Sequence, residues 1–175
     1  MLDFVFRLML TTGATFWMVI VFGIKEHWTL CIFPAEVIGI ALMMVPIALS
    51  GIAFLMSRFF NRDSIQNCTD CVLADNDFLP VYLGYFFVAL SINDSITLCF
   101  VYAIVFIFTF ITQTQYFNPL FLLFGYHFYH VVTLQGTQVF LIVKGKVIRN
   151  VQDVKFTDMR RLNDTTYIVR KDKRE

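Results

Sequence analysis

The sequence predicts a membrane protein made of an all-α bundle of four transmembrane helices and a small C-terminal cytoplasmic antiparallel β domain. Three observations lead to this fold class. Hydrophobic residues make up 58% of the chain and charged residues only 15%, whereas a soluble domain carries about 25% charged residues. Ten of the 14 Lys and Arg residues lie at or after Lys144, so the preceding region has too few charges to cover a water-facing surface. Long apolar runs fill that region, and short alternating runs follow it.

The first two apolar runs each have the length of a transmembrane helix. Residues 4–24 and 35–56 each provide about 20 residues, which cross a hydrocarbon layer of ~30 Å. Arg7, near the start of the first run, is expected to extend its guanidinium to the lipid head groups. Pro46, inside the second run, predicts a kink.

Small residues follow one face of the second predicted span. In membranes, small residues let neighbouring helices approach closely. We therefore expect this face to form an oligomer interface, made of Ala35, Gly39, Pro46, Ser50 and Ala53.

The third apolar run, residues 78–111, is too long for one span. Asn93 and Asp94 interrupt it, and an Asp at the bilayer centre would cost roughly 2.5–3.5 kcal/mol. A tight hairpin avoids that cost. It predicts a short span at 78–92 and a second span at 95–112, with Asp94 or Ser95 as the N-cap. A single long helix with a buried polar pair is the alternative.

The remaining chain predicts a connector and a small sheet. Residues 1–114 form the transmembrane domain, with 57–77 as a polar loop. Residues 115–125 are apolar but too short to span, and predict an interfacial connector. Residues 126–175 form a β-rich basic domain, a small antiparallel sheet or open barrel, because β-branched and aromatic runs alternate with turn signals. The expected strands are 127–133, 137–143, 147–151, 154–159 and 165–169.

The distribution of cations predicts the orientation. Four spans place both termini and residues 57–77 on one side, which then holds all Lys and Arg residues except Lys25. Cytoplasmic loops are enriched in these residues, so both termini are expected in the cytoplasm. Three spans are the alternative, and would export either the basic tail or Arg58 and Arg62.

The basic residues are candidates for partner binding. Residues 144–175 contain ten basic and five acidic residues, a net charge of +5, which suits anionic lipid or an acidic partner. Acidic residues are mixed through this segment, so direct nucleic-acid binding is not expected. The predicted partner-binding residues are Arg58, Arg62, Lys144, Lys146, Arg149, Arg160 and Arg161.

Cys68 and Cys71 form a CxxC motif, a weak candidate for a metal site or a redox pair. A closed zinc site needs four ligands, so a second subunit or His residues would have to complete it, and an ordinary reduced loop is the favoured interpretation. His127 and His130 would share a face on a helix but point to opposite faces of a strand, which is the expected structure here. We therefore predict no metal and no cofactor.

Three classes of function remain. The favoured class is a membrane scaffold that senses a stimulus and binds a cytoplasmic partner. A small oligomeric ion channel or pore is the alternative, in which Arg7, Glu36 and Asp94 would line the ion pathway. A redox carrier using the two cysteines is the third. The sequence contains no recognisable catalytic constellation, so we do not expect an enzyme.

The chain also resembles a known family. Residues 118–129 (Asn-Pro-Leu-Phe-Leu-Leu-Phe-Gly-Tyr-His-Phe-Tyr) lead through Gly136 into Val-Phe-Leu-Ile-Val at 139–143 and Lys-Gly-Lys-Val-Ile-Arg-Asn at 144–150. With four spans before it, this pattern resembles the KwaA family, the membrane subunits of the bacterial two-gene Kiwa anti-phage defence system. The resemblance covers the architecture of the whole chain and is most specific over residues 118–150.

The resemblance implies a location and partners. It implies a protein of the bacterial inner membrane that forms homo-oligomers, thought to be tetramers, and holds a cytoplasmic effector resembling KwaB, which acts on phage DNA processes. It also implies a sensor of phage attachment or injection at the envelope. No catalytic residues carry over from the family.

Overall fold

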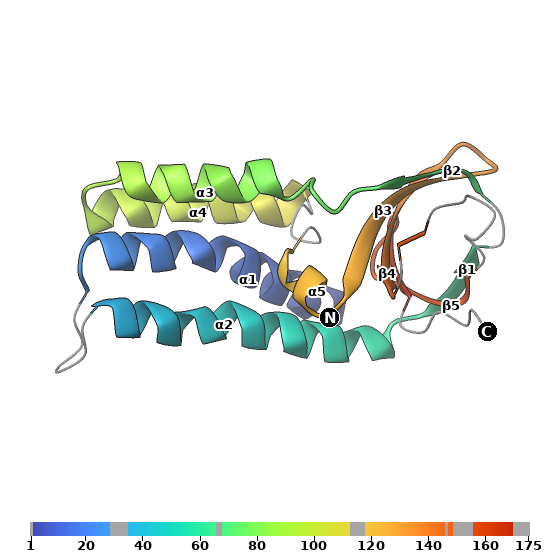
Figure 1. The fold of residues 1–175 in the computed structure, drawn as a ribbon, viewed down its shortest axis with the longest axis horizontal. Helices are drawn as coiled ribbons and strands as arrows, with labels where there is room; N and C mark the ends of the chain where they lie inside the picture. Colours follow the sequence, from blue (N-terminus) through green and yellow to red (C-terminus); the bar gives the residue numbers. More distant parts are fainter. Residues whose placement is uncertain are drawn as a thin grey trace. The chain divides into compact units, whose positions relative to one another are not determined.

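The computed structural model describes residues 2–28, 35–65, 68–112, 118–145, 147–148 and 156–169. The chain forms two compact units. The helical unit consists of Met1–Ala53 and Phe78–Asn118, and the sheet unit of Phe54–Asp77 and Pro119–Glu175 (Figure 1).

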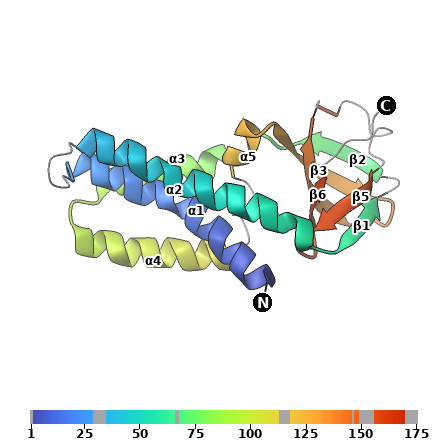
Figure 2. The same cartoon turned by 90° about the horizontal axis from the view of Figure 1, so that it is seen from below.

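Four helices supply the helical unit: α1 (Leu2–Lys25), α2 (Ala35–Met56, whose last turn belongs to the sheet unit), α3 (Leu79–Ser91) and α4 (Ser95–Thr112). α1 packs against both α3 and α4 (Figure 2). Their shared core includes Met18 and Phe22 of α1, Tyr85 of α3 and Leu98 of α4. The long apolar runs of the sequence therefore form helices close to the predicted boundaries.

The predicted hairpin between α3 and α4 is confirmed. α3 ends where Ile92 adopts an extended conformation, and α4 begins at Ser95. Asp94 caps α4, because its Oδ1 accepts the Thr97 N–H at 2.8 Å and its carbonyl accepts the Leu98 N–H at 3.1 Å. Hydrogen bonds from Thr97 lower the pKa of the Asp94 carboxyl, as expected for an acidic N-cap.

The number of full-length spans differs from the prediction. Within the described parts of the chain, three helical segments are long and apolar enough to cross a membrane: Asp3–Lys25, Val37–Phe59 and Ser95–Thr112. α3 has 13 residues, which correspond to about 20 Å of helix. Three of the four predicted spans are therefore long enough to cross by themselves, and α3 is shorter because the chain leaves the helix before the polar pair at 93–94.

Arg7 does not have the environment expected of it. Its Nη2 donates to the Phe110 carbonyl of α4 at 3.3 Å, and the guanidinium lies over the Phe110 ring, 5.2 Å from the centroid. At the other end of α1, Lys25 Nζ donates to the Ile92 carbonyl and to Asn93 Oδ1. Both cations of α1 therefore join it to the α3–α4 hairpin.

The sheet unit contains a six-stranded mixed sheet with the order β1-β5-β6-β4-β3-β2. Its strands are β1 (Arg62–Ile65), β2 (Cys68–Leu73), β3 (Tyr126–Thr133), β4 (Gln138–Lys144), β5 (Phe156–Arg161) and β6 (Thr166–Val169). A one-turn helix, α5 (Leu120–Leu123), precedes β3, and a 3₁₀ turn, η1 (Ser57–Phe59), follows α2.

Three predictions for this part of the chain are wrong. Residues 57–77 are not only a loop, because they supply β1 and β2. The sheet is not purely antiparallel, because β6 runs parallel to β4. Residues 147 and 148 of the expected strand 147–151 are not in a strand, and 149–151 lie outside the described residues. All three errors concern pairing between distant segments: β6 inserts between β4 and β5, so the chain after β4 cannot form a simple hairpin.

The sheet curls around an apolar inner face. Residues on this face include Tyr129 and Val131 of β3, Leu141 of β4 and Met159 of β5, all buried in one cluster. Ile148 closes over this core, since its N–H donates to the Tyr129 hydroxyl at 2.9 Å. Alternate residues, such as Phe128, Ile142 and Ile168, share the outer face of the sheet.

Candidate interaction surfaces

The small-residue face of α2 packs within this chain. Gly39, Pro46, Ser50 and Ala53 are all buried, and the side chain of Ala35 lies outside the described residues. A Cβ on Gly39 would lie 2.7 Å from Ile24 Cγ1 of α1. A Cβ on Gly13 of α1 would lie 3.7 Å from the Pro46 carbonyl oxygen and from Ser50 Oγ. The close helix approach that this face allows is therefore made by α1 of the same chain.

A buried polar contact lies on the same face. Asn118 Nδ2 donates to Ser50 Oγ at 2.9 Å, and both residues are at most 1% exposed. Sequence reasoning assigned no role to Asn118. Polar groups in an apolar bundle are normally held by such partners, so this contact fixes the chain that follows α4 against α2.

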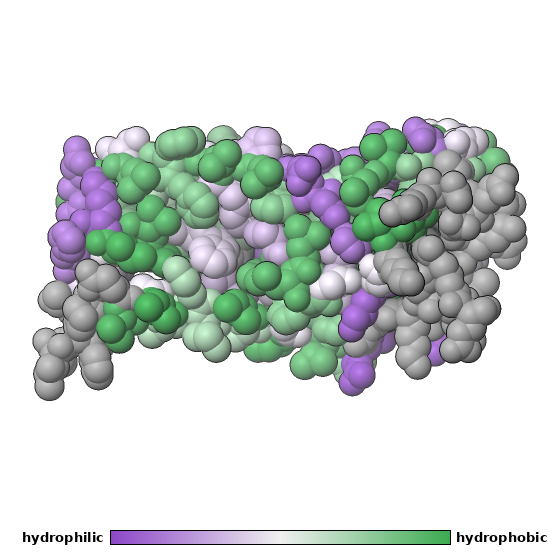
Figure 3. Space-filling model, in the orientation of Figure 1, coloured by the Kyte–Doolittle hydropathy of each residue, from purple (hydrophilic) through white to green (hydrophobic). Residues whose placement is uncertain are grey.

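The remaining surface of the helices is apolar. Hydrophobic residues cover most of the face of the helices shown in Figure 3, and hydrophilic residues gather at the end where α3 meets α4. α4 presents a stripe with helical spacing, made of Ile96, Phe100, Ile104, Phe108 and Ile111, all more than half exposed. An apolar surface of this extent is suited to lipid or to another apolar helix.

The predicted partner-binding cations do not form one patch. Arg58, Arg62, Lys144 and Arg161 are exposed and Arg160 is half-buried, while Lys146 and Arg149 lie outside the described residues. Strand register places Arg62 directly opposite Arg160 on the outer face of the sheet. Lys144 shares that face, with its Nζ 5.6 Å from the centre of the Tyr126 ring. Arg161 lies on the opposite face and pairs with Asp164 at 2.8 Å.

Cys68 and Cys71 lie on strand β2 as free thiols. A bulge between Cys68 and Asp70 shifts the alternation of the strand, so both thiols pack against the inner core. Burial, with Asp70 nearby, raises the pKa of Cys68, and burial beside Cys68 and Asp70 raises the pKa of Cys71 to about 11. A raised pKa keeps these thiols protonated at neutral pH, which slows reactions that need the thiolate.

Two histidine–aspartate pairs hold the turn between β2 and α3. His127 Nδ1 lies 2.7 Å from Asp75 Oδ2, and His130 Nε2 lies 2.9 Å from Asp77 Oδ2. Asp75 Oδ1 also accepts the Phe128 N–H at 2.7 Å. The histidines are on strand β3 and on opposite faces, as predicted. Among the residues that the structure describes, no group of three or more His, Cys, Asp or Glu residues is placed to hold a metal ion.

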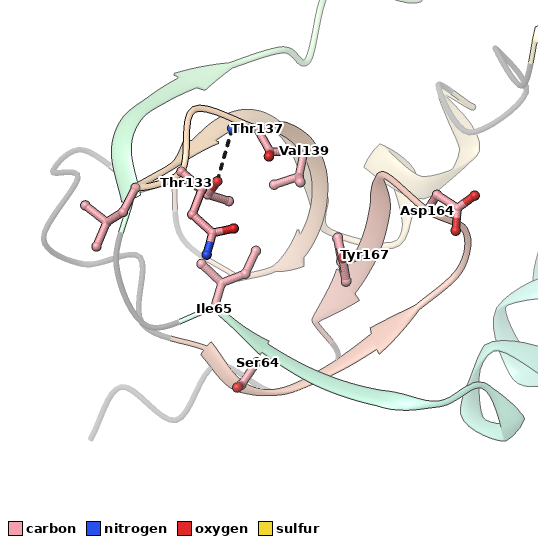
Figure 4. Close-up of a pocket in the computed structure, with 9 residues that line it drawn as sticks. Ser64, Ile65, Thr133, Thr137, Val139, Asp164 and Tyr167 are labelled. Atoms are coloured by element: carbon pink, nitrogen blue, oxygen red, sulfur yellow. Dashed lines mark hydrogen bonds between the residues drawn. The ribbon is translucent and has the colours of Figure 1, made fainter.

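The sheet unit has one end open to solvent at the β3–β4 hairpin. A pocket of about 400 Å³ lies there (Figure 4). It is lined by Ser64, Ile65, Thr133, Leu134, Gln135, Thr137, Val139, Asp164 and Tyr167. Burial, together with Asp63, raises the pKa of the Tyr167 hydroxyl. Sequence reasoning did not find this pocket, because three separate segments form its wall.

Comparison with known proteins supplies the family. No curated protein and no solved structure matches the chain. A family model described as anti-phage protein KwaA matches residues 6–168, which include nearly all residues of the helices and strands described above. This match shows that the chain belongs to the KwaA family of anti-phage proteins.

Proposed function

We propose that this chain is the inner-membrane sensor and scaffold subunit of an anti-phage defence complex, which oligomerises in the membrane and holds a cytoplasmic, DNA-acting effector. Family membership supports the role in defence. The apolar helices α1, α2 and α4 support membrane insertion. The sensing role rests on the family alone.

One structural observation carries the scaffold role: segments on both sides of the α3–α4 hairpin build one sheet. β1 and β2 precede α3, whereas β3 to β6 follow α4, and all six strands are hydrogen-bonded in one order. Strands of one sheet lie on the same side of a membrane. Residues 57–77 and the C-terminal segment therefore share a side, which requires an even number of crossings between them and disfavours the three-span topology.

An even number of crossings between β2 and β3 gives α3 a role although it is short. α4 is long enough to cross, so α3 has to carry the chain across in the opposite direction before it. The bonds from Lys25 to Ile92 and Asn93 hold the α3–α4 turn beside the C-terminal end of α1. A helix of about 20 Å in a layer of ~30 Å is accommodated by thinning the bilayer locally. The positive-inside rule then places both termini and the sheet in the cytoplasm.

We assign the effector contact to the open end of the sheet. β3 starts three residues after α5 and runs eight residues to its hairpin, about 27 Å along a strand. The hairpin is therefore remote from α5, and Leu134 at its tip is 65% exposed. We choose this end because Leu134 lines the pocket and offers an exposed apolar side chain that a bound protein would cover.

Membrane retention of the effector tests this function. The full chain is co-expressed with a KwaB-type effector, and the effector is measured in the membrane pellet together with phage plating efficiency. Leu134→Asp is expected to move the effector to the soluble fraction and to abolish protection from phage.

Val72→Asp is the matched control. Val72 is also exposed, at 53%, and lies on edge strand β2, so the substitution adds the same charge elsewhere on the sheet. It is expected to leave retention and protection intact. An effector that stays soluble beside the unmodified chain would overturn the scaffold role, and retention by Leu134→Asp would overturn the assigned contact.

A further inference from the structure

The one-turn helix α5 exposes two adjacent apolar side chains. Leu120 and Phe121 are at most 3% exposed, whereas Leu123 is 78% exposed and Phe124 is 42% exposed. A helix of four residues is not stable by itself in water, so the packing of its buried side has to hold it in place. The exposed pair is therefore fixed in position by the buried pair.

The buried side of α5 packs close to the end of a candidate membrane span. The Phe121 ring lies 6.3 Å from the Tyr126 ring, and the Tyr126 ring lies 5.3 Å from the Phe54 ring, measured between ring centres. Both distances are typical of aromatic contacts. Phe54 belongs to the last turn of α2, within the segment Val37–Phe59 that is long and apolar enough to cross a membrane. Two ring contacts thus join α5 to the end of this segment.

The path of the chain leads to the same region. α4, a second candidate span, ends at Thr112, and α5 begins eight residues later at Leu120. The chain that enters α5 has therefore just left an apolar helix. Apolar side chains of a helix at a membrane surface enter the boundary between head groups and acyl chains by roughly 5–10 Å. Leu123 and Phe124 are residues of this kind.

A basic residue lies beside α5. The Gly145 N–H donates to the Gly125 carbonyl at 3.2 Å, which brings Lys144 next to the residue that follows Phe124. Lys144 is exposed, and its Nζ lies 5.6 Å from the centre of the Tyr126 ring. A lysine at the edge of an apolar surface lays its stem along that surface and extends its ammonium group to anionic head groups.

We infer that α5 and Lys144 form a surface anchor, in which Leu123 and Phe124 enter the lipid interface and Lys144 binds the phosphate of an anionic phospholipid. A lipid surface is the occupant that fits, because the exposed pair is joined to the end of a candidate span and the adjacent charge is basic. The anchor holds the start of β3 at the membrane. It rests on the membrane insertion proposed above and does not involve the effector contact at the β3–β4 hairpin.

A depth measurement on the full chain tests the anchor. All four cysteines are replaced by Ser, and Leu123→Cys is labelled with the fluorophore NBD and reconstituted into vesicles of phosphatidylcholine and phosphatidylglycerol. Lipids that carry a doxyl quencher either near the head group or deep in the acyl chain are then added. The label at position 123 is expected to be quenched strongly by the shallow doxyl group and weakly by the deep one.

Two other positions calibrate this measurement. Leu134→Cys is the matched control, because Leu134 is also an exposed leucine of the sheet unit, at 65%, but lies at the β3–β4 hairpin. A label there is expected to be unaffected by either doxyl lipid. Ile104→Cys, in the middle of α4 and 52% exposed, reports on membrane insertion itself, and the deep doxyl group is expected to quench it most.

The role of Lys144 is tested with the label kept at position 123. Phosphatidylglycerol and phosphatidylcholine that carry the same shallow doxyl group are compared at equal mole fractions. Phosphatidylglycerol is expected to be enriched at the label up to about fivefold, because one basic residue near an anionic surface contributes about that factor. Lys144→Gln should remove this preference, and Lys144→Arg should keep it. Arg161→Gln, which removes a charge paired with Asp164, should also keep it.

The possible results separate the anchor from the membrane insertion on which it rests. Quenching at position 104 but not at 123 would overturn the anchor and leave the insertion standing. Absence of quenching at both positions would overturn the insertion itself. A label at 123 that is shielded from doxyl lipids and from aqueous iodide alike would show a contact with protein, such as a second copy of the chain, and would also overturn the anchor. An unchanged preference for phosphatidylglycerol in Lys144→Gln would overturn the assignment of Lys144.

Discussion

At the scale of single residues, the polar groups of this chain are held by neighbours that are distant in sequence. Arg7 was expected to reach lipid head groups, but it binds the Phe110 carbonyl. His127 and Asp75 are 52 positions apart and form a close pair. A single sequence identifies such residues by type, yet their partners depend on tertiary packing. The residue types of the surfaces were therefore predictable and their pairings were not.

Cys71 gives a prediction at this scale. Burial is the largest cause of its raised pKa, so a variant with Cys71 as its only thiol should keep a pKa above the ordinary value of 9.0. With the pKa near 11, the thiolate fraction at pH 8 falls about 100-fold. The rate of alkylation by iodoacetamide, measured against pH, is expected to rise up to about pH 11.

The sign of the effect on stability follows from the same shift. The folded pKa of Cys71 is raised, so the fold favours the protonated thiol. The stabilisation of the fold that comes from keeping this thiol protonated is fully present below the unfolded pKa near 9. It is lost as the pH rises through about 11. Alkylation of the folded chain with an apparent pKa well below 9 would contradict this and would favour the redox interpretation of Cys68 and Cys71.

At the scale of elements, the helices and four of the six strands were predictable, and β1 and β2 were not. Helix ends follow local signals, such as the Asn93-Asp94 interruption before α4. β1 is short and largely polar (Arg-Asp-Ser-Ile). β2 (Cys-Thr-Asp-Cys-Val-Leu) mixes polar and apolar residues without strict alternation. They become strands by pairing with β5 and β3, more than 50 residues away. A pattern read along the chain contains no signal for such pairing.

The packing of α1 on α2 gives a prediction at the element scale. A Cβ on Gly13 would be in ordinary contact with Leu49, Pro46 and Ser50, so Ala fits at this position and Leu does not. Gly13→Leu is expected to destabilise the protein by about 1–3 kcal/mol through overpacking. The measurement is thermal or denaturant unfolding in detergent.

Gly51 on α2 supplies the control, because a Cβ there would meet no atom within 4 Å. Gly51→Leu is expected to be neutral, or slightly stabilising through higher helix propensity. A stable Gly13→Leu that loses its oligomeric state instead would show that the small-residue face of α2 works between subunits.

At the scale of the whole molecule, the order of elements along the chain determines how the protein can assemble. α3 and α4 are inserted between two parts of one sheet. β1 and β2 must therefore wait until the hairpin and the rest of the sheet have been synthesised. Pairing over such separations is slow. Under the proposed topology, the sheet closes only after the α3–α4 hairpin has returned the chain to the same side of the membrane.

The topology gives the last prediction, at the scale of the whole chain. All four cysteines are replaced by Ser, and single cysteines are introduced at Asn93, Asn76 or Gln135, which are all exposed. In cells with a permeabilised outer membrane, a membrane-impermeant maleimide is expected to label position 93. Positions 76 and 135 should be labelled only after lysis, because they belong to one sheet unit and the proposed topology puts that unit on the cytoplasmic side. Labelling of 76 and 93 from the same side would mean that α3 does not cross the bilayer. In that case α4 alone would separate β2 from β3, and these strands could not belong to one sheet in a membrane.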